Sequence, residues 1–384
     1  MTGMILVSND FPPKVGGIQN YLYELWSRLP LSDTRVITTK YKGAGEFDKR
    51  QTFDIERYSK ILWPTPKLAS HVNAVVRELK SDAVLIDPLL PTGLLTSRID
   101  NAAKILIIHG AEVTVPGRIY PTRHLIKKAA RDCDVVISAG NYAARELVRS
   151  LGQPINLVRI PPGVDTKTFS PPTREQKLLA RQQLCLELNI DESSRIILST
   201  SRIVPRKGFD VGISSLADLE KDIHLVIIGK GRDQKRLVAL ADKRGVSDRV
   251  HFLGSVSLTK LVSTYHAADL FMMLCRDRWA SLEAEGFGIV FLEAAACGLP
   301  VIAGRSGGSA EALLHGRSGY VVDPESVSEI RDRIRSILDD DNTREVFGRE
   351  GRNFVEHDHS YDYLATLLLP LVSGDLSSAR PFDG

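Results

Sequence analysis

A cluster of cations follows the segment 195–200, which has the apolar character of a buried strand. The loop after it reads Ser-Arg-Ile-Val-Pro-Arg-Lys-Gly and holds Arg202, Arg206 and Lys207. Its proline fixes one backbone angle and its glycine permits a tight turn, so that Arg202 and Lys207 can be directed at one anionic group. A diphosphate needs such charge-assisted contacts, both to bind and to depart as a leaving group. The loop therefore predicts a diphosphate site, and an exposed basic loop is the alternative.

Two glutamates, Glu285 and Glu293, flank a glycine-rich turn in the run Glu-Gly-Phe-Gly-Ile-Val-Phe-Leu-Glu. Gly288 precedes a helix that we expect to begin near Ile289. The free N–H groups of Ile289 and Val290 at such a helix end can bind a phosphate. Carboxylates accept hydrogen bonds from hydroxyl groups, so one glutamate suits a ribose and the other a sugar. A pair of solvated carboxylates is the alternative.

The first apolar segment, 4–8, is followed by a loop that contains Asp10, Gly16 and Gly17 and leads into a helix through Gln19. Two glycines before a helix let a ligand approach backbone N–H groups, whose partial positive charge favours a phosphate. A simple chain turn would use the same glycines. The loop holds neither a GxGxxG fingerprint nor a GxxxxGK[ST] phosphate loop.

His109 ends the apolar segment 104–108, and the ends of parallel strands are where ligand-binding side chains gather. A histidine there serves either the chemistry of a site or the structure. Asp132 and Asp134 form an Asp-x-Asp pair, but the pair precedes a strand instead of ending one, so we predict no metal site. Gln234 replaces the third glycine of a later GxGxxG-like run, which argues against a dinucleotide.

Two frameworks must position these residues, because short apolar segments alternate with helix-period segments in two series. Several segments are apolar on both faces, as a parallel sheet between two helical layers requires. A proline-rich stretch at 161–172 interrupts the alternation. We predict an α/β protein with two doubly wound, Rossmann-like domains, at 1–165 and 166–359, facing a central cleft. A helix at 360–374 should pack back on the first domain.

The 384 residues suffice for two domains of roughly 150 residues each, and 43% hydrophobic with 25% charged residues is an ordinary globular composition. No apolar stretch reaches the ~18 residues of a membrane span. The N-terminus does not resemble a signal peptide, and the four scattered cysteines suit a reducing compartment. We therefore predict a cytoplasmic protein.

The net charge of +3 is unevenly distributed. Residues 1–160 contain 22 of the 50 basic and 15 of the 47 acidic residues, so this part carries +7 and the remainder −4. The helix-period segment 121–131 holds Arg123, His124, Lys127, Lys128 and Arg131. Such a face suits anionic lipid at the inner face of the plasma membrane, and an ordinary surface helix is the alternative. We predict no nucleic-acid partner.

Four motifs combine into a resemblance that spans essentially the whole chain. They are Gly-Gly-Ile-Gln at 16–19, His-Gly-Ala-Glu at 109–112, the cationic loop at 201–208 and the run from Glu285 to the glycine at 304. Together they resemble the retaining GT-B glycosyltransferases of family 4. The combination of NDFPPKVGGIQNYL with RDRWASLEAEGFGIVFLEA looks most like the phosphatidylinositol mannosyltransferases.

The resemblance implies transfer of mannose from GDP-mannose to a phosphatidylinositol mannoside, forming an α-1,6 link, with retention and without a metal or other cofactor. Arg202 and Lys207 would bind the donor diphosphate, Glu293 the ribose, Glu285 the transferred sugar and the backbone around Val256 the base. The remaining residues implied by the resemblance are His109 as an active-site group, Gly17 on the donor side, and Asp10, Gly16 and Gln19 on the acceptor side.

Three alternatives share this architecture. They are a family 4 transferase that uses a UDP-sugar and another acceptor, a nucleotide-sugar epimerase, and a non-catalytic nucleotide-sugar-binding protein. The joint presence of the two cations and two glutamates argues against the last of these.

Overall fold

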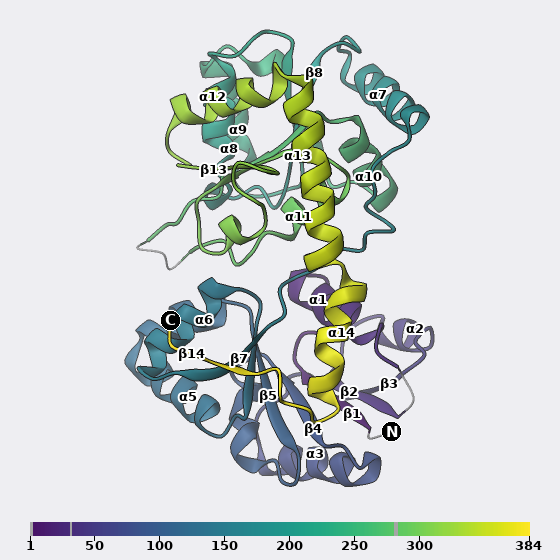
Figure 1. Ribbon diagram of the computed structural model, residues 1–384, viewed down its shortest axis with the longest axis vertical. Helices are drawn as coiled ribbons and strands as arrows, with labels where there is room; N and C mark the ends of the chain where they lie inside the picture. The colour runs from purple at the N-terminus through teal and green to yellow at the C-terminus, as the bar shows by residue number, and fades with distance from the viewer. Residues whose placement is uncertain (1–2, 31–32, 280–282) are drawn as a thin grey trace. The chain divides into compact units, whose positions relative to one another are not determined.

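The computed structural model describes residues 3–30, 33–279 and 283–384. The chain forms two compact units, which Figure 1 shows with many of their helices and strands labelled. Unit 1 consists of Met1–Gly163 together with Tyr361–Gly384, and unit 2 consists of Val164–Ser360. The chain therefore passes from one unit to the other twice, and each unit has its own sheet and core.

Unit 1 is built on an eight-stranded sheet with the strand order β14-β7-β6-β5-β4-β1-β2-β3. Its neighbouring strands are parallel, except that β14 runs antiparallel to β7. The strands are β1 (Met4–Ser8), β2 (Thr34–Thr39), β3 (Asp54–Ser59), β4 (Ala83–Asp87), β5 (Ala103–Ile108), β6 (Val135–Ser138), β7 (Ile155–Arg159) and β14 (Arg380–Phe382). Strands β1, β4 and β6 are buried throughout, as expected for a parallel sheet covered on both faces.

Helices cover both faces of this sheet. They are α1 (Gly17–Trp26), α2 (Ala44–Asp48), α3 (Pro66–Leu79), α4 (Ala111–Arg118), α5 (Tyr120–Arg131), α6 (Asn141–Leu151) and α14 (Tyr361–Val372), with the 3-10 helix η1 (Thr92–Arg98). Apolar residues of α1 and α14 share one core with Leu6 and Leu85 of the sheet. Residues of α3, α5 and α6 share the opposite core with Val7 and Ile86, since successive strand residues point to opposite faces.

Unit 2 contains a six-stranded sheet, parallel throughout, with the order β10-β9-β8-β11-β12-β13. The strands are β8 (Arg195–Thr200), β9 (Ile223–Ile228), β10 (Val250–Gly254), β11 (Leu270–Met273), β12 (Val301–Gly304) and β13 (Gly319–Val322). The order reverses beside β8, which starts the series, and this reversal is the hallmark of a doubly wound sheet.

The helices of unit 2 form two layers. They are α7 (Arg174–Leu188), α8 (Phe209–Leu216), α9 (Gln234–Lys243), α10 (Leu258–Ala267), α11 (Ile289–Ala296), α12 (Val327–Leu338) and α13 (Asp341–Phe354), with the shorter helices η2 (Pro205–Lys207), η3 (Ser247–Arg249), η4 (Ser309–Glu311) and η5 (Val355–His359). Helices α7, α10 and α11 contribute to one core cluster, and α8, α9 and α12 contribute to the other. Helix α11 is buried and almost wholly apolar, so its position is fixed by packing.

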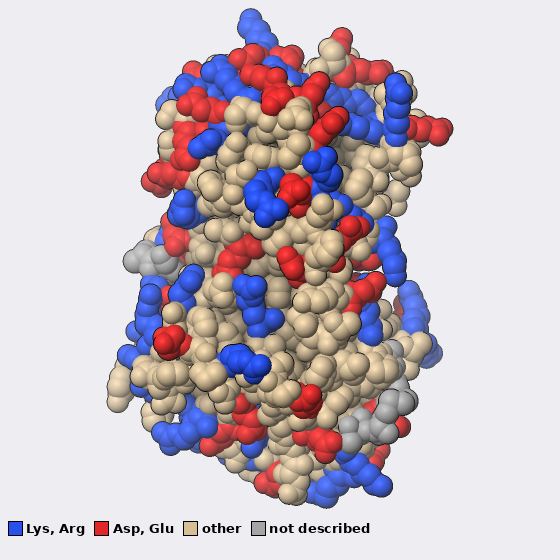
Figure 2. All heavy atoms as spheres, in the orientation of Figure 1, with Lys and Arg blue, Asp and Glu red and all other residues tan. Residues whose placement is uncertain are grey.

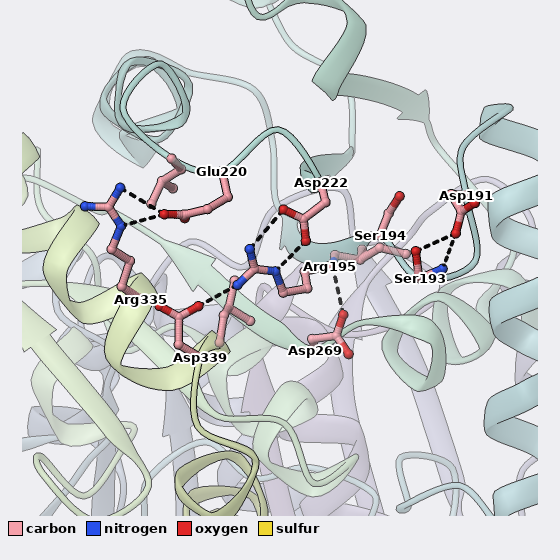
Figure 3. A network of polar contacts seen from close by, with 12 residues as sticks. Asp191, Ser193, Ser194, Arg195, Glu220, Asp222, Asp269, Arg335 and Asp339 are labelled. Atoms are coloured by element: carbon pink, nitrogen blue, oxygen red, sulfur yellow. Dashed lines mark hydrogen bonds and ion pairs between the residues drawn. The ribbon is translucent and has the colours of Figure 1, made fainter.

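Polar contacts tie together the amino ends of strands in unit 2, as Figure 3 shows. Arg195, at the start of β8, donates to both oxygens of Asp222 at 2.7 and 2.9 Å and to Asp339 Oδ1 at 2.6 Å. Asp269 accepts from the backbone N–H of Ile196 at 2.8 Å. These contacts lie at the edge opposite the strand ends that carry the predicted site.

The predicted fold class, two doubly wound α/β domains, is confirmed. The sequence did not reveal β3 and β14, which have different reasons for being inconspicuous. Strand β3 is the last strand on its side of the sheet and is only half-buried, so it lacks the continuous apolar run of the central strands. Strand β14 has three residues and is mostly exposed.

Candidate active site

The predicted donor residues of unit 2 follow three of its strands. Lys207 follows β8, Val256 follows β10, and Glu285 with helix α11 follows β11. Because the strands are parallel, their carboxyl ends share one edge of the sheet, which is where open α/β sheets bind ligands.

Glu285 is the centre of a buried ionic cluster. Its Oε2 atom accepts from Lys207 Nζ at 2.6 Å and from an Arg206 guanidinium nitrogen at 2.6 Å. The Cys275 thiol donates to the same oxygen at 3.4 Å. The backbone N–H of Glu285 donates to Ser306 Oγ at 3.1 Å, which fixes the residue from its other side.

The two cations determine the charge of Glu285. Burial by itself would raise the pKa of this carboxyl, but Lys207 and Arg206 lower it to about 2 through charge and hydrogen bonds. Glu285 is therefore a carboxylate at neutral pH. Burial, followed by the charge of Glu285, raises the pKa of the neighbouring Cys275 thiol, so this cysteine is an unreactive hydrogen-bond donor.

Glu293 has a different environment, in the second turn of α11. Its Oε2 atom accepts a hydrogen bond from the Tyr265 hydroxyl at 2.9 Å, and Tyr265 also contacts Thr200 Oγ1 at 3.1 Å. No cation pairs with Glu293 in the described part of the chain. Burial raises the pKa of this carboxyl to about 7, and the hydrogen bond from Tyr265 offsets only part of that rise.

The amino end of α11 lies beside Glu285. Gly288 precedes the helix with a φ of 92°, and a Cβ there would lie 2.5 Å from the Phe291 ring and 3.8 Å from Glu285 Cγ. Only glycine fits this backbone and this space. The N–H groups of Ile289 and Val290 lie in the first turn, and within the described residues no side chain caps that turn.

The remaining predicted donor residues lie outside this cluster. Arg202 is exposed and makes no polar contact with the residues that the structure describes. Val256 is half-buried and packs against the core cluster of α7, α10 and α11.

In unit 1, Asp10 accepts two contacts from other residues of the predicted acceptor-side loop and of helix α1. Its Oδ1 atom accepts from Lys14 Nζ and from Gln19 Nε2, both at 2.6 Å. A Cβ on Gly16 would lie 2.2 Å from Gln19 Oε1, so a side chain at this position would displace the amide from Asp10. Gly16 and Gly17 are exposed, and Gly17 begins α1.

His109 stands at the end of β5 and pairs with a carboxylate that sequence reasoning missed. Its Nε2 atom lies 2.6 Å from Asp87 Oδ1, and Ser8 Oγ donates to Asp87 Oδ2 at 2.7 Å. Burial lowers the pKa of His109, but Asp87, with smaller contributions from Glu112 and Asp10, outweighs that effect and raises it. Asp87 is fully buried, so this carboxylate favours the protonated form of the imidazole at the strand end.

Three residues of the two sites were not predicted: Arg206, Tyr265 and Asp87. Asp87 could have been recognised, because it directly follows the apolar segment 83–86 on the strand next to that of His109. Arg206 stands beside Lys207 in the predicted loop. Tyr265 carries no sequence signal, since only the folded chain brings α10 against α11.

The described residues form neither a metal-binding cluster nor a helix that could span a membrane. No group of three or more His, Cys, Asp or Glu side chains among them could hold a metal ion. None of the helices traced in 3–30, 33–279 and 283–384 is both long and apolar enough to cross a bilayer. Residues 280–282 are part of the motif quoted above and lie outside the described residues.

Two doubly wound units of this kind define the GT-B class of fold, and solved structures share it. HepE from Anabaena, solved in complex with UDP, superposes with a TM-score of 0.80 at 18% identity, covering 96% of this chain and 99% of that one. Sucrose-phosphate synthase from Thermosynechococcus elongatus superposes with a TM-score of 0.75 at 21% identity, covering 96% and 98%.

Sequence comparison adds the family. The family model described as Glycosyl transferases group 1 matches residues 182–354, and that described as Glycosyltransferase Family 4 matches residues 15–168. The chain is 34% identical over 388 residues to the GDP-mannose-dependent alpha-(1-6)-phosphatidylinositol monomannoside mannosyltransferase of Mycobacterium tuberculosis, covering 98% of this chain and 99% of that protein. The chain belongs to the family 4 glycosyltransferases.

Other relatives carry related names. The GDP-mannose-dependent monoacylated alpha-(1-6)-phosphatidylinositol monomannoside mannosyltransferase of Corynebacterium glutamicum is 33% identical over 383 residues, covering 97% of this chain and 98% of that protein. A D-inositol 3-phosphate glycosyltransferase from Xylanimonas cellulosilytica is 32% identical over 263 residues, covering 67% and 59%. The predicted family is confirmed. Of the relatives described here, the two mannosyltransferases are similar over nearly the full length of the chain.

Proposed function

We propose that this chain transfers mannose from GDP-mannose to a phosphatidylinositol monomannoside and forms an α-(1-6) link. The observation that carries the proposal is the similarity of essentially the whole chain to enzymes named for this reaction. Similarity over both units matters, because donor and acceptor specificity need not reside in the same one.

We assign the binding of the donor, GDP-mannose, to unit 2. In the proposal, Lys207, Arg202 and the N–H groups at the start of α11 bind the diphosphate, because cations and a helix amino end both favour an anion. Glu293 accepts hydrogen bonds from the ribose, Glu285 accepts them from the mannose, and the backbone around Val256 contacts the base.

The transfer itself needs charge stabilisation and placement. The bond between the mannose C1 and the diphosphate oxygen breaks, a bond from C1 to the acceptor oxygen forms on the same face, and the acceptor proton passes to the departing diphosphate. Lys207 and the amino end of α11 stabilise the charge that develops on that diphosphate. His109, held by Asp87, is placed beside the reacting sugar, while Asp10, Gly16 and Gln19 shape the acceptor loop, with Gly17 next to the donor.

A peripheral contact with an anionic membrane is the second part of the proposal. Basic side chains line the edge of unit 1 where α5 and α6 lie, as Figure 2 shows. Lys127 and Lys128 are exposed there, whereas Arg123 is fixed by donating to the Ser150 carbonyl at 2.7 Å. The double variant K127A/K128A should therefore bind acidic vesicles less than the wild type does. The matched variant K235A/K243A on α9 should bind them as strongly as the wild type. Equal co-sedimentation of both variants would contradict the membrane contact.

The transfer is tested by incubating the purified full chain with GDP-mannose and phosphatidylinositol monomannoside. We expect a dimannosylated lipid, formed equally well in the presence of EDTA, and no product from UDP-glucose. Product from the UDP-sugar alone would indicate the related transferase, and an isomerised sugar nucleotide without acceptor would indicate an epimerase. Nucleotide binding with no change in either substrate would indicate a non-catalytic protein.

A further inference from the structure

Arg206 and Lys207 share a single atom of the site. Both donate to Glu285 Oε2 at 2.6 Å, and neither donates to Oε1. Lys207 is 6% exposed and Glu285 is 8% exposed, so solvent cannot replace either partner. The pocket thus holds two cations on one carboxylate oxygen.

This arrangement conflicts with the proposed task of Lys207. A lysine has one compact charge on a flexible stem, and its ammonium group cannot serve Glu285 and a diphosphate with full strength at the same time. When a donor binds, Lys207 must share its charge with the phosphates. Glu285 is then left buried with fewer partners, and an unpaired buried carboxylate is costly.

We propose that Arg206 is a positioning residue for Glu285, holding the ionised carboxylate in place when Lys207 turns to the donor diphosphate. This inference rests on the proposed function, because it assigns Lys207 to the diphosphate and Glu285 to the transferred sugar. The inference gives Arg206 a task that is distinct from donor binding.

The surroundings of Arg206 suit this role. Its backbone carbonyl accepts from the N–H of Arg276 at 2.9 Å, so the loop after β8 is tied to the segment after β11. Its Nε atom lies 3.9 Å from Glu283, which pairs with Arg278 on the same loop. Only 15% of the Arg206 side chain is exposed, and a guanidinium stays charged at any working pH. Arg206 is therefore held on Glu285 by several contacts that do not involve Lys207.

The other groups around Glu285 cannot replace this charge. The Cys275 thiol is neutral, and Ser306, which contacts the backbone of Glu285, donates its hydroxyl to Asp277 at 2.6 Å. Glu283, which lies 3.9 Å from Arg206, is an acidic residue and adds no positive charge. Without Arg206, burial would raise the pKa of Glu285 in the donor complex, and the carboxylate would be lost as the pH falls.

The test compares R206M, the charge-conserving R206K and the matched variant R305M. Arg305 is exposed on the loop after β12, near the cluster but outside it. Transfer from GDP-mannose is measured between pH 5.5 and 9, GDP affinity is measured by calorimetry, and the folded state is checked by thermal unfolding. If R206M does not fold, R206Q takes its place.

We expect R206M to lower kcat about tenfold at pH 6 and less at pH 9, which is the loss expected if about nine-tenths of Glu285 is protonated at pH 6 in the donor complex of the variant. GDP affinity and KM for GDP-mannose should stay near wild type, R206K should restore the pH profile, and R305M should match the wild type. An unchanged pH profile, or a loss of GDP affinity as large as the loss of kcat, would overturn the inference. An inactive wild type would instead overturn the proposed function.

Discussion

Glu285 and Glu293 lie eight residues apart, on the two sides of one helix start, and yet their pKa values are shifted in opposite directions. Glu285 contacts Lys207 and Arg206, and its pKa is lowered to about 2. Glu293 contacts only the Tyr265 hydroxyl in the described part of the chain, and its pKa is raised to about 7. Burial acts on both carboxyls in the same direction. The difference is therefore set by whether a cation reaches the carboxyl.

Such a pair of environments separates two tasks. A carboxylate that is ionised at every working pH can interact with developing positive charge on a sugar. A carboxyl that titrates near neutrality can change its charge when a ligand brings hydrogen-bond donors. We infer that Glu285 serves the reaction and that Glu293 serves recognition of the nucleotide.

The substitution Glu285→Gln tests the first half of this comparison and should have the largest effect. We expect turnover to fall by about 10²- to 10³-fold, as for loss of one preorganised electrostatic group. The substitution also leaves Arg206 and Lys207 without a counter-charge, which should cost about 3 kcal/mol of unfolding free energy at pH 7. The pKa of Glu285 is lowered from 4.5, so this stability is present above pH 4.5 and disappears as the pH falls toward 2. Urea unfolding at pH 7 and pH 3 measures it, and near-normal turnover would contradict the role of Glu285.

The substitution Asp87→Asn extends the comparison to unit 1, where the buried carboxylate of Asp87 raises the pKa of His109. We expect turnover to fall by about tenfold or somewhat more, because His109 loses its partner. The His109 pKa is raised in the folded state, so the contribution of the pair, about 2 kcal/mol, is full below pH 6.5 and is lost as the pH rises past the raised value. Stability measured at pH 6 and pH 9 tests this, with the exposed Asp82→Asn as control. A loss that is the same at both pH values would exclude a charged His109.

The substitution Glu293→Gln tests the second half of the comparison. Ribose hydroxyls that donate to this group favour its ionised form, so the wild type should release protons when it binds GDP near pH 7, and E293Q should release fewer. Affinity for GDP should weaken about tenfold or less. Because the pKa is raised from 4.5 to about 7, the wild type loses stability over that pH range and E293Q should not. Calorimetry in buffers of different ionisation enthalpy counts the protons, and equal release by both proteins would remove Glu293 from the nucleotide site.

The substitution Tyr265→Phe should have the smallest effect. It tests how the environment of Glu293 sets the pKa of that carboxyl. It removes the hydrogen bond to Glu293, so the pKa of that carboxyl should rise further. The free energy of unfolding should fall by about 1 kcal/mol, typical of one hydrogen bond. Thermal unfolding and the pH dependence of GDP affinity measure the two effects. A lower pKa of Glu293 in this variant would contradict the assigned direction of the hydrogen bond.

The sequence predicted the framework of the molecule better than its charge pattern. Alternating apolar segments located the central strands, because a parallel sheet buries both faces of each strand and so leaves a continuous apolar run. Edge strands such as β3 lack that run and were not found. The glycines around Glu285 predicted a helix start beside a strand end. Gly288 lies at this start, with a positive φ and no room for a Cβ beside Phe291.

The sequence could not assign partners. The folded loop directs Lys207 and Arg206 to Glu285, a pairing that the sequence did not predict, and leaves Arg202 exposed. Side-chain direction within a short loop depends on contacts with other strand ends, such as that of Arg206 with Arg276, and these are not encoded in spacing. The opposite pKa shifts of Glu285 and Glu293 follow from those contacts and were not predictable from residue type.

The central claim is that a neighbouring cation, and not burial, sets the difference between the pKa values of the two glutamates. It is tested most directly by carbon-13 NMR titration of glutamate side chains, with E285Q and E293Q used to assign the two carboxyl resonances. We predict that the resonance absent from E285Q titrates near pH 2 and that the resonance absent from E293Q titrates near pH 7. Two resonances that titrate together near pH 4.5 would contradict the account.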